Sequence, residues 1–96
     1  MLEKDIEKYL KRRVEQRGGL CLKFVSPGST GVPDRLCVFP EGRIAFVETK
    51  TKRGKLSPRQ QYVIGELQKL RAEVVVLHDT DEVDIWLDGS GKETRL

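Results

Sequence analysis

The sequence predicts a single α/β domain in which helices flank a mixed sheet of four strands. Two observations support this prediction. Apolar side chains recur at helical spacing in two segments, 2–17 and 57–70, and four shorter runs rich in aliphatic residues lie between and after them. A short turn joins the second and third runs, which favours an antiparallel pair, whereas a helix-length connection before the fourth run favours a parallel crossover.

Length and composition limit the protein to one domain, which we expect to span residues 1–96 with a flexible tail at 89–96. A chain with 38% hydrophobic and 34% charged residues is globular rather than disordered. Its apolar runs are too short for a membrane span. The charged start Met1–Asp5 lacks the apolar core of a signal peptide, so we expect a cytoplasmic protein.

The first predicted helix covers residues 2–17 and ends at Gly18 and Gly19. On a wheel of about 100° per residue, one continuous apolar arc is formed by Leu2, Ile6, Tyr9, Leu10 and Val14. Glu3 falls inside this arc. An acid that faces inward is costly unless it is paired or binds a metal, but an acid in the first turn is also favoured by the helix dipole. Both interpretations of Glu3 remain open.

Three strands are predicted next, at residues 20–25, 34–39 and 43–49. The loop between the first two, residues 26–32, consists mainly of small residues and is either flexible or closely approached by a ligand. The third strand carries apolar residues on both faces from Ile44 to Val47, which marks an interior strand covered on both sides. The turn Pro40–Gly42 would pair the second and third strands antiparallel.

The end of the third strand carries the strongest candidate for chemistry. Glu48 and Lys50 are two residues apart, so a strand directs both side chains to the same face. Asp34, directly after Pro33, begins the neighbouring strand and would lie beside this end of the third. We interpret the two carboxylates and the lysine as a metal-dependent catalytic site, although an acid-x-Lys pattern alone is usually a structural salt bridge.

A basic loop and a second helix follow this acidic pair. The cations clustered there are Lys50, Lys52, Arg53, Lys55 and Arg59. Such a run is often only a solvated loop, but at the mouth of a carboxylate site it fits a polyanionic substrate such as nucleic acid. Ser57 as N-cap, Pro58 and Gln60 form a capping box at the helix start. Gln60 also borders the apolar face on the side toward the sheet, so capping and a role in the site are both open.

The chain is predicted to end in a buried strand at 73–77 and a short helix at 80–87 that packs Val83, Trp86 and Leu87 inward. We expect the acids around this helix to be solvated: Asp79, Asp81, Glu82, Asp84 and Asp88. The arginines of the first helix could contact DNA, but we prefer to interpret them as a solubilising surface: Arg12, Arg13 and Arg17.

The residue types at the candidate site favour a hard metal ion. Asp34 and Glu48 offer carboxylate oxygens, which suit Mg²⁺ or Mn²⁺. A zinc site lacks partners, because His78 is the only histidine and the two cysteines lie inside apolar runs. A bound divalent ion would lower the pKa of its water and neutralise charge on a scissile phosphate. Lys50 would orient that water or stabilise the transition state.

The order of these features resembles the PD-(D/E)xK nuclease superfamily, with Pro33–Asp34 and Glu48–Lys50 as the two halves of its motif. More narrowly, the chain resembles the VRR-NUC (virus-type replication-repair nuclease) family. The matching segments are Leu2–Ile6 with its Glu3, Gly18–Gly19, Gly31–Asp34, Phe46–Lys50 and Leu56–Gln60. Only the tail beyond about Leu87 falls outside the resemblance.

The resemblance implies a restriction-endonuclease-like core of order α-β-β-β-α-β and metal-dependent cleavage of DNA phosphodiester bonds. It implies that Asp34, Glu48 and the backbone carbonyl of Thr49 bind the metal, with Glu3 completing the site directly or through water. Lys50 would be the catalytic lysine, and Gln60 an active-site residue from the second helix. Thr49 departs from the aliphatic residue more usual in the family, which should matter little if its side chain faces away from the metal.

Minimal members of the family look like phage-type proteins that act as homodimers on four-way junctions. The resemblance therefore implies branched DNA as the partner, cut by two sites related by a twofold axis, with Lys52, Arg53, Lys55 and Arg59 as DNA contacts. Two other functions remain open from the sequence. One is a nuclease for flaps, nicked duplex or single strands, and the other is a DNA-binding module without catalysis.

Overall fold

The computed structural model describes residues 1–89, so the expected tail lies outside the described residues apart from Gly89. The elements in chain order are α1 (Glu3–Gln16), β1 (Leu20–Lys23), β2 (Arg35–Val38), the 3₁₀ turn η1 (Pro40–Gly42), β3 (Ile44–Thr49), α2 (Pro58–Lys69), β4 (Glu73–Leu77) and α3 (Thr80–Gly89). The predicted order is confirmed, although β1 and β2 are shorter than the apolar runs that predicted them.

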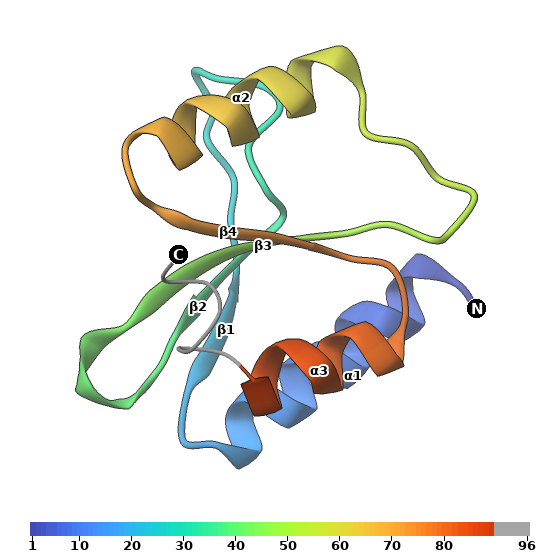
Figure 1. Cartoon of the computed structure of the whole chain (residues 1–96), viewed down its shortest axis with the longest axis vertical. Helices are drawn as coiled ribbons and strands as arrows, with labels where there is room; N and C mark the ends of the chain where they lie inside the picture. Colours follow the sequence, from blue (N-terminus) through green and yellow to red (C-terminus); the bar gives the residue numbers. More distant parts are fainter. Residues whose placement is uncertain (90–96) are drawn as a thin grey trace.

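The four strands form one mixed sheet in the order β1-β2-β3-β4. The pairs β1–β2 and β2–β3 are antiparallel, and β3–β4 is parallel, as the turn and the helical crossover predicted. Figure 1 shows α2 on one face of the sheet and α1 with α3 on the other. The strand β3 is therefore interior, and its carboxyl end lies next to that of β4.

The face toward α1 and α3 is the hydrophobic core. Cys21 pairs with Cys37 across β1 and β2, and Cys37 with Ala45 across β2 and β3, so all three share this face. These residues and Val47 are buried, and both cysteines are free thiols. The helices contribute the buried residues Ile6, Leu10 and Val14 from α1 and Val83, Trp86 and Leu87 from α3. Burying this many large side chains fixes both helices on the sheet.

The face toward α2 is only partly covered. The helix packs against β4, at one end of the strand order, and the rings of Phe24 and Phe46 contact each other with centroids 5.7 Å apart. At the other end, Leu20, Leu22 and Ile44 remain 57%, 46% and 50% exposed. The prediction that β3 is covered on both faces is therefore wrong at Ile44. The reason is that one helix of twelve residues does not span the sheet.

Two further predictions need correction in the C-terminal part. We expected β4 to be buried, but only Leu77 is, because β4 is the edge strand of the sheet. We expected the acids of α3 to be solvated, but Asp84 accepts a hydrogen bond from the hydroxyl of Tyr9 at 2.7 Å. The ion pairs Arg13–Asp84 and Arg17–Asp88 also join α1 to α3. The arginines of α1 thus serve helix packing at these two positions.

Within residues 1–89, the helices are all too short or too polar to cross a membrane.

Candidate active site

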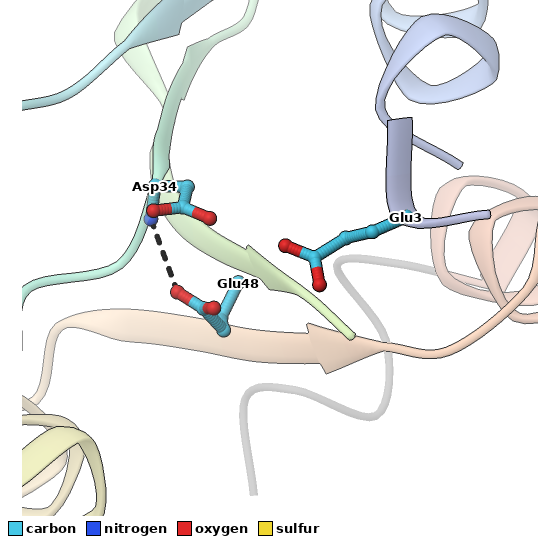
Figure 2. Close-up of side chains that lie close together, drawn as sticks. All are labelled: Glu3, Asp34 and Glu48. Atoms are coloured by element: carbon cyan, nitrogen blue, oxygen red, sulfur yellow. Dashed lines mark hydrogen bonds between the residues drawn. The ribbon is translucent and has the colours of Figure 1, made fainter. Parts of the chain in front are cut away.

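Three carboxylates from distant parts of the chain meet at the carboxyl end of β3. One oxygen atom from each of Glu3, Asp34 and Glu48 lies within 4.8 Å of the others. Figure 2 shows Glu3 reaching from the start of α1 toward the two acids of the sheet. The meeting of Asp34 and Glu48 follows from strand register: Arg35 pairs with Val47, so the residue before one lies beside the residue after the other. The inward position predicted for Glu3 brings it to the same place.

Glu48 lies at the centre of this cluster and is 1% exposed. Its Oε1 accepts a hydrogen bond from the backbone N–H of Asp34 at 3.2 Å, drawn in Figure 2. Its Oε2 accepts one from the side-chain amide of Gln60 at 3.2 Å and lies 3.8 Å from Nζ of Lys50. A fixed carboxylate with donors on both oxygens is held in one orientation, with the lysine beside it.

The electrostatic environment disfavours a negative charge on Glu48. Burial, and then the nearby charge of Asp34, raises the pKa of Glu48 to about 7, with a smaller contribution from Glu3. The ammonium of Lys50 and the N–H of Asp34 lower this pKa, but they do not outweigh the burial. Lys50 therefore does not fully compensate the negative charge of the cluster, whose carboxylate oxygens are the ligands that Mg²⁺ and Mn²⁺ prefer. The residues fit a divalent cation.

Gln60 combines the two roles that the sequence left open. Its side-chain Oε1 accepts a hydrogen bond from the backbone N–H of Ser57 at 2.9 Å. The backbone N–H of Gln60 donates to Oγ of Ser57 at 3.1 Å, which completes the capping box. Because the oxygen is used in the cap, the amide nitrogen points to Glu48. The start of α2 is therefore coupled directly to the acidic cluster.

A close contact fixes the loop that carries Asp34. Gly31 has a φ of +87°, and a Cβ there would lie 2.7 Å from Cγ of Arg59. Nε of Arg59 also donates to the carbonyl of Thr30 at 3.3 Å. The sequence left open whether this loop is flexible or closely approached by a ligand, and at Gly31 the close neighbour is the first turn of α2. This contact holds both Asp34 and Gln60 in place.

A second positioning contact joins α1 to β2. Arg35 donates to Oε1 of Glu7 at 2.8 Å, and both side chains are largely buried. Glu7 lies one turn after Glu3, and Arg35 follows Asp34, so the pair fixes two carboxylates of the cluster relative to each other. The sequence analysis missed this pair. The only available sign was that Glu7 lies at the edge of the apolar arc of α1.

The predicted DNA contacts lie on the loop after β3 and at the start of α2. Nζ of Lys52 is 3.1 Å from Oδ2 of Asp79, a second acid that we expected to be solvated. Arg53 and Lys55 are exposed. Arg59 is also exposed, and its guanidinium carbon lies 5.2 Å from the centroid of the Tyr62 ring, within the limit of about 6 Å for a cation–π contact. A role for these residues in DNA binding stays a prediction.

Thr49 turns its side chain away from the cluster. Strand alternation places it on the face opposite Glu48, where it is fully buried. Its Oγ1 is buried without a hydrogen-bond partner within residues 1–89. The departure from an aliphatic residue thus affects the core and leaves the metal side of the strand unchanged. The use of the Thr49 carbonyl as a metal ligand stays a prediction.

The mixed sheet, with its acidic cluster and neighbouring lysine at one strand end, defines a domain of the restriction-endonuclease-like class. Comparison with known proteins narrows this class. The family model of the VRR-NUC domain matches residues 2–81, and the chain belongs to the VRR-NUC family.

Two relatives agree with this assignment. The chain is 46% identical over 79 residues to a protein named "Putative nuclease p44" of Acyrthosiphon pisum secondary endosymbiont phage 1, covering 82% of this chain and 85% of that protein. A solved structure of a VRR-NUC domain superposes with a TM-score of 0.88 at 35% sequence identity, covering 92% of this chain and 96% of the other. The family model spans the positions of all three acids of the cluster.

Proposed function

We propose that this protein is a divalent-metal-dependent DNA endonuclease that hydrolyses phosphodiester bonds at the cluster of Glu3, Asp34 and Glu48. Membership of the VRR-NUC family supports a nuclease. The observation that carries the proposal is the placement of Lys50 Nζ 3.8 Å from a buried carboxylate that two further acids surround. A purely structural salt bridge does not need three convergent carboxylates, which repel one another unless a cation binds them.

The cation would be Mg²⁺ or Mn²⁺, held by Asp34, Glu48 and the backbone carbonyl of Thr49, with Glu3 as a ligand directly or through water. Such an ion supplies a water of lowered pKa and neutralises charge on the phosphate. The protein would contribute fixed geometry, because Gln60 and the N–H of Asp34 each hold one oxygen of Glu48.

Lys50 would act on the substrate. Its ammonium would stabilise the negative charge that accumulates on the phosphate in the transition state, or orient the attacking water. The exposed cations of the loop would bind neighbouring phosphates: Lys52, Arg53, Lys55 and Arg59. Each of these residues lies within ten positions of Lys50 along the chain.

The substrate that we propose is branched DNA, in particular a four-way junction, cut by a homodimer. The proposal follows the family resemblance, and the relative named above is encoded by a phage. The exposed apolar residues Leu20, Leu22 and Ile44 on the open sheet face offer a surface that a second copy could cover. A twofold axis would then present two active sites to the two strands of a junction. We propose that the enzyme acts in the cytoplasm, where such DNA is found.

The dimer has its own test. Leu22→Glu places a charge in the middle of the exposed apolar surface without touching the core, so the variant should fold and become monomeric. Light scattering would measure the molar mass of wild type and variant, with Lys69→Glu as an exposed control on α2. A monomeric wild type would contradict the dimer but leave the nuclease proposal intact.

The central experiment is cleavage of a labelled four-way junction with Mg²⁺, with Mn²⁺ and with EDTA. We expect paired symmetric cuts by the wild type with metal, and none by Glu48→Gln or with EDTA. Glu66→Gln, which changes an acid on α2 that pairs with Lys69, is the matched control and should cut normally. Preferred cutting of a flap, nick or single strand would keep the nuclease and replace the substrate. Binding without cutting would favour the non-catalytic DNA-binding module.

A further inference from the structure

The structure contains a cavity that the proposed catalysis does not use. Its volume is about 450 Å³, and it is lined by Met1, Thr51, Lys52, Arg53, His78 and Asp79. The segments that line it also build the active site. Met1 lies two residues before Glu3, and Thr51 directly follows Lys50. A ligand in this cavity would therefore contact segments that also carry the proposed catalytic residues.

His78 is brought to the cavity by the parallel pairing of β3 and β4. Thr49 is opposite Leu77 in this register, and the N–H of Lys50 donates to the carbonyl of Leu77 at 3.0 Å. His78 follows Leu77, so its backbone lies beside that of Lys50. The single histidine of the chain thus neighbours the proposed catalytic lysine, although the two are 28 positions apart in the sequence.

The imidazole of His78 is held in one orientation by the first turn of α3. Oε1 of Glu82 lies 2.8 Å from the backbone N–H of His78 and 2.9 Å from its Nδ1. Because a carboxylate only accepts, Nδ1 carries the proton. The other ring nitrogen, Nε2, has no hydrogen-bond partner within the described part of the chain. The ring of this lining residue is therefore held in one orientation with one nitrogen available.

The same turn positions a cation over the cavity. Oδ1 of Asp79 accepts the N–H of Glu82 at 2.8 Å and caps α3, while Oδ2 lies 3.1 Å from Nζ of Lys52. The charge of Asp79 is thus paired with a lysine of the loop. Arg53 adds a second, exposed cation to the lining. Lys52 offsets the one lining acid and Arg53 adds a net positive charge, which favours an anionic ligand.

We infer that this cavity is the subsite for the nucleotide next to the scissile phosphate, and that Nε2 of His78 contacts its phosphodiester group. This inference rests on the proposed nuclease function. The volume lies within the range, about 300–1,000 Å³, of pockets that enclose small ligands, and one nucleotide is of that size. Phosphate oxygens only accept, so this contact uses the ring with a proton on both nitrogens, Nε2 facing the phosphate and Nδ1 facing the carboxylate of Glu82. Glu82 is then a positioning residue.

A single nucleotide enters a cavity more readily where it is not stacked in a continuous duplex. The subsite would therefore favour DNA with unstacked nucleotides beside the cut, as at a branch point. It links the substrate class to particular residues on this chain, His78, Lys52 and Arg53, rather than to the overall positive charge of the loop.

The test combines protein variants with single uncharged phosphates in the DNA. A labelled junction carries a methylphosphonate at one position at a time, and its binding is measured by fluorescence anisotropy without divalent metal, so that the DNA stays intact. We expect wild-type affinity to fall about five- to tenfold at one phosphate beside the cut. His78→Ala should bind the natural junction as weakly as the wild type binds the junction with that phosphate uncharged. The variant should lose no further affinity when the same phosphate is replaced. Lys69→Ala, a distant surface cation, should behave as wild type.

The methylphosphonate leaves the protein unchanged, so the wild-type scan does not depend on the folding of any variant. Glu82→Gln should weaken the sensitivity to that one phosphate, and Glu82→Asp should restore part of it, whereas a structural role would lower affinity equally at all positions. If His78→Ala and each methylphosphonate lower the affinity for DNA by amounts that simply add, at every position tested, the inference would be overturned.

Failure of the inference can be separated from failure of the proposed function. If the protein cuts junctions normally, but the effects of His78→Ala and of each uncharged phosphate on affinity add, only the subsite is refuted. Coupling at one phosphate near the branch, in a protein that cuts no substrate with Mg²⁺ or Mn²⁺, would refute the nuclease function and leave the binding site for a nucleotide.

Discussion

The two faces of the sheet differ in what covers them and in what they carry. Toward α1 and α3 the strands present mainly small and aliphatic residues that are buried, such as Ala45 and Val47. Toward α2 they present Glu48 and Lys50 at one end and exposed leucines at the other. Because strand residues alternate, one strand supplies both environments. Residues adjacent in sequence should therefore respond to mutation in opposite ways.

Glu48→Gln should have the largest effect, and it should affect activity rather than folding. Removing a metal ligand and the partner of Lys50 is expected to lower the cleavage rate by at least about 100-fold. Gln has nearly the same volume and carries no charge to bury, so the metal-free protein should melt at the same or a higher temperature at pH 8. Cleavage rates and thermal melts of the same preparation measure both. A lower melting temperature would mean that the acid is structural.

The pH dependence of stability should report the same buried acid. The pKa of Glu48 is about 7 in the folded protein, against an ordinary value of 4.5. Between these values the folded state binds more protons than the unfolded state, so the free energy of unfolding should fall as the pH rises from about 4.5 to 7. The difference corresponds to about 3 kcal/mol. Urea denaturation in EDTA across this range measures it.

Glu48→Gln is the control for this pH dependence, because it removes the titrating group and keeps the other acids. The variant should show a flatter profile than the wild type over the same interval. Identical profiles would show that Glu48 is ionised at little cost in the folded protein. In that case the acidic cluster would be less strained without metal than we infer.

Val47→Ala should give the opposite result to Glu48→Gln. Val47 is fully buried against α1 and α3, and removing two carbon atoms there should lower the free energy of unfolding by about 2 kcal/mol. Its side chain faces away from the acidic cluster, so the cleavage rate per folded molecule should remain within about twofold of the wild type. Urea denaturation and junction cleavage at a temperature well below the melting transition measure the two quantities. A large loss of activity would show that the faces are coupled.

The helices, strands and their pairing could be predicted because local patterns determine them. The capping box at Ser57 fixed the start of α2, and the short turn at Pro40 made the antiparallel pair the simplest connection. That pair alone is enough to bring Asp34 beside Glu48. The convergence of Glu3 on the same point needed the inward position of Glu3 on its helix and the resemblance to the family.

Other contacts between segments distant in the sequence could not be predicted. The exposed fraction of β4 depends on its place at the edge of the sheet, and a run of valines is equally compatible with an interior strand. The acids of α3 were expected to be solvated because nothing in their own segment indicates that α1 packs alongside with Tyr9, Arg13 and Arg17. The placement of His78 beside Lys50 likewise depends on the pairing of β3 with β4, which are distant in the sequence.

Thr49→Val should have the smallest effect and should stabilise the protein. The hydroxyl of Thr49 is buried on the core side of β3 and lacks a hydrogen-bond partner among residues 1–89, so folding removes it from water without compensation. Valine has the same shape without the hydroxyl, and we expect the free energy of unfolding to rise by about 1 kcal/mol. The backbone carbonyl is unchanged, so cleavage should be unaffected. A destabilised variant would indicate that an ordered water satisfies the hydroxyl, and that the covered face of the sheet is less dry than its apolar lining implies.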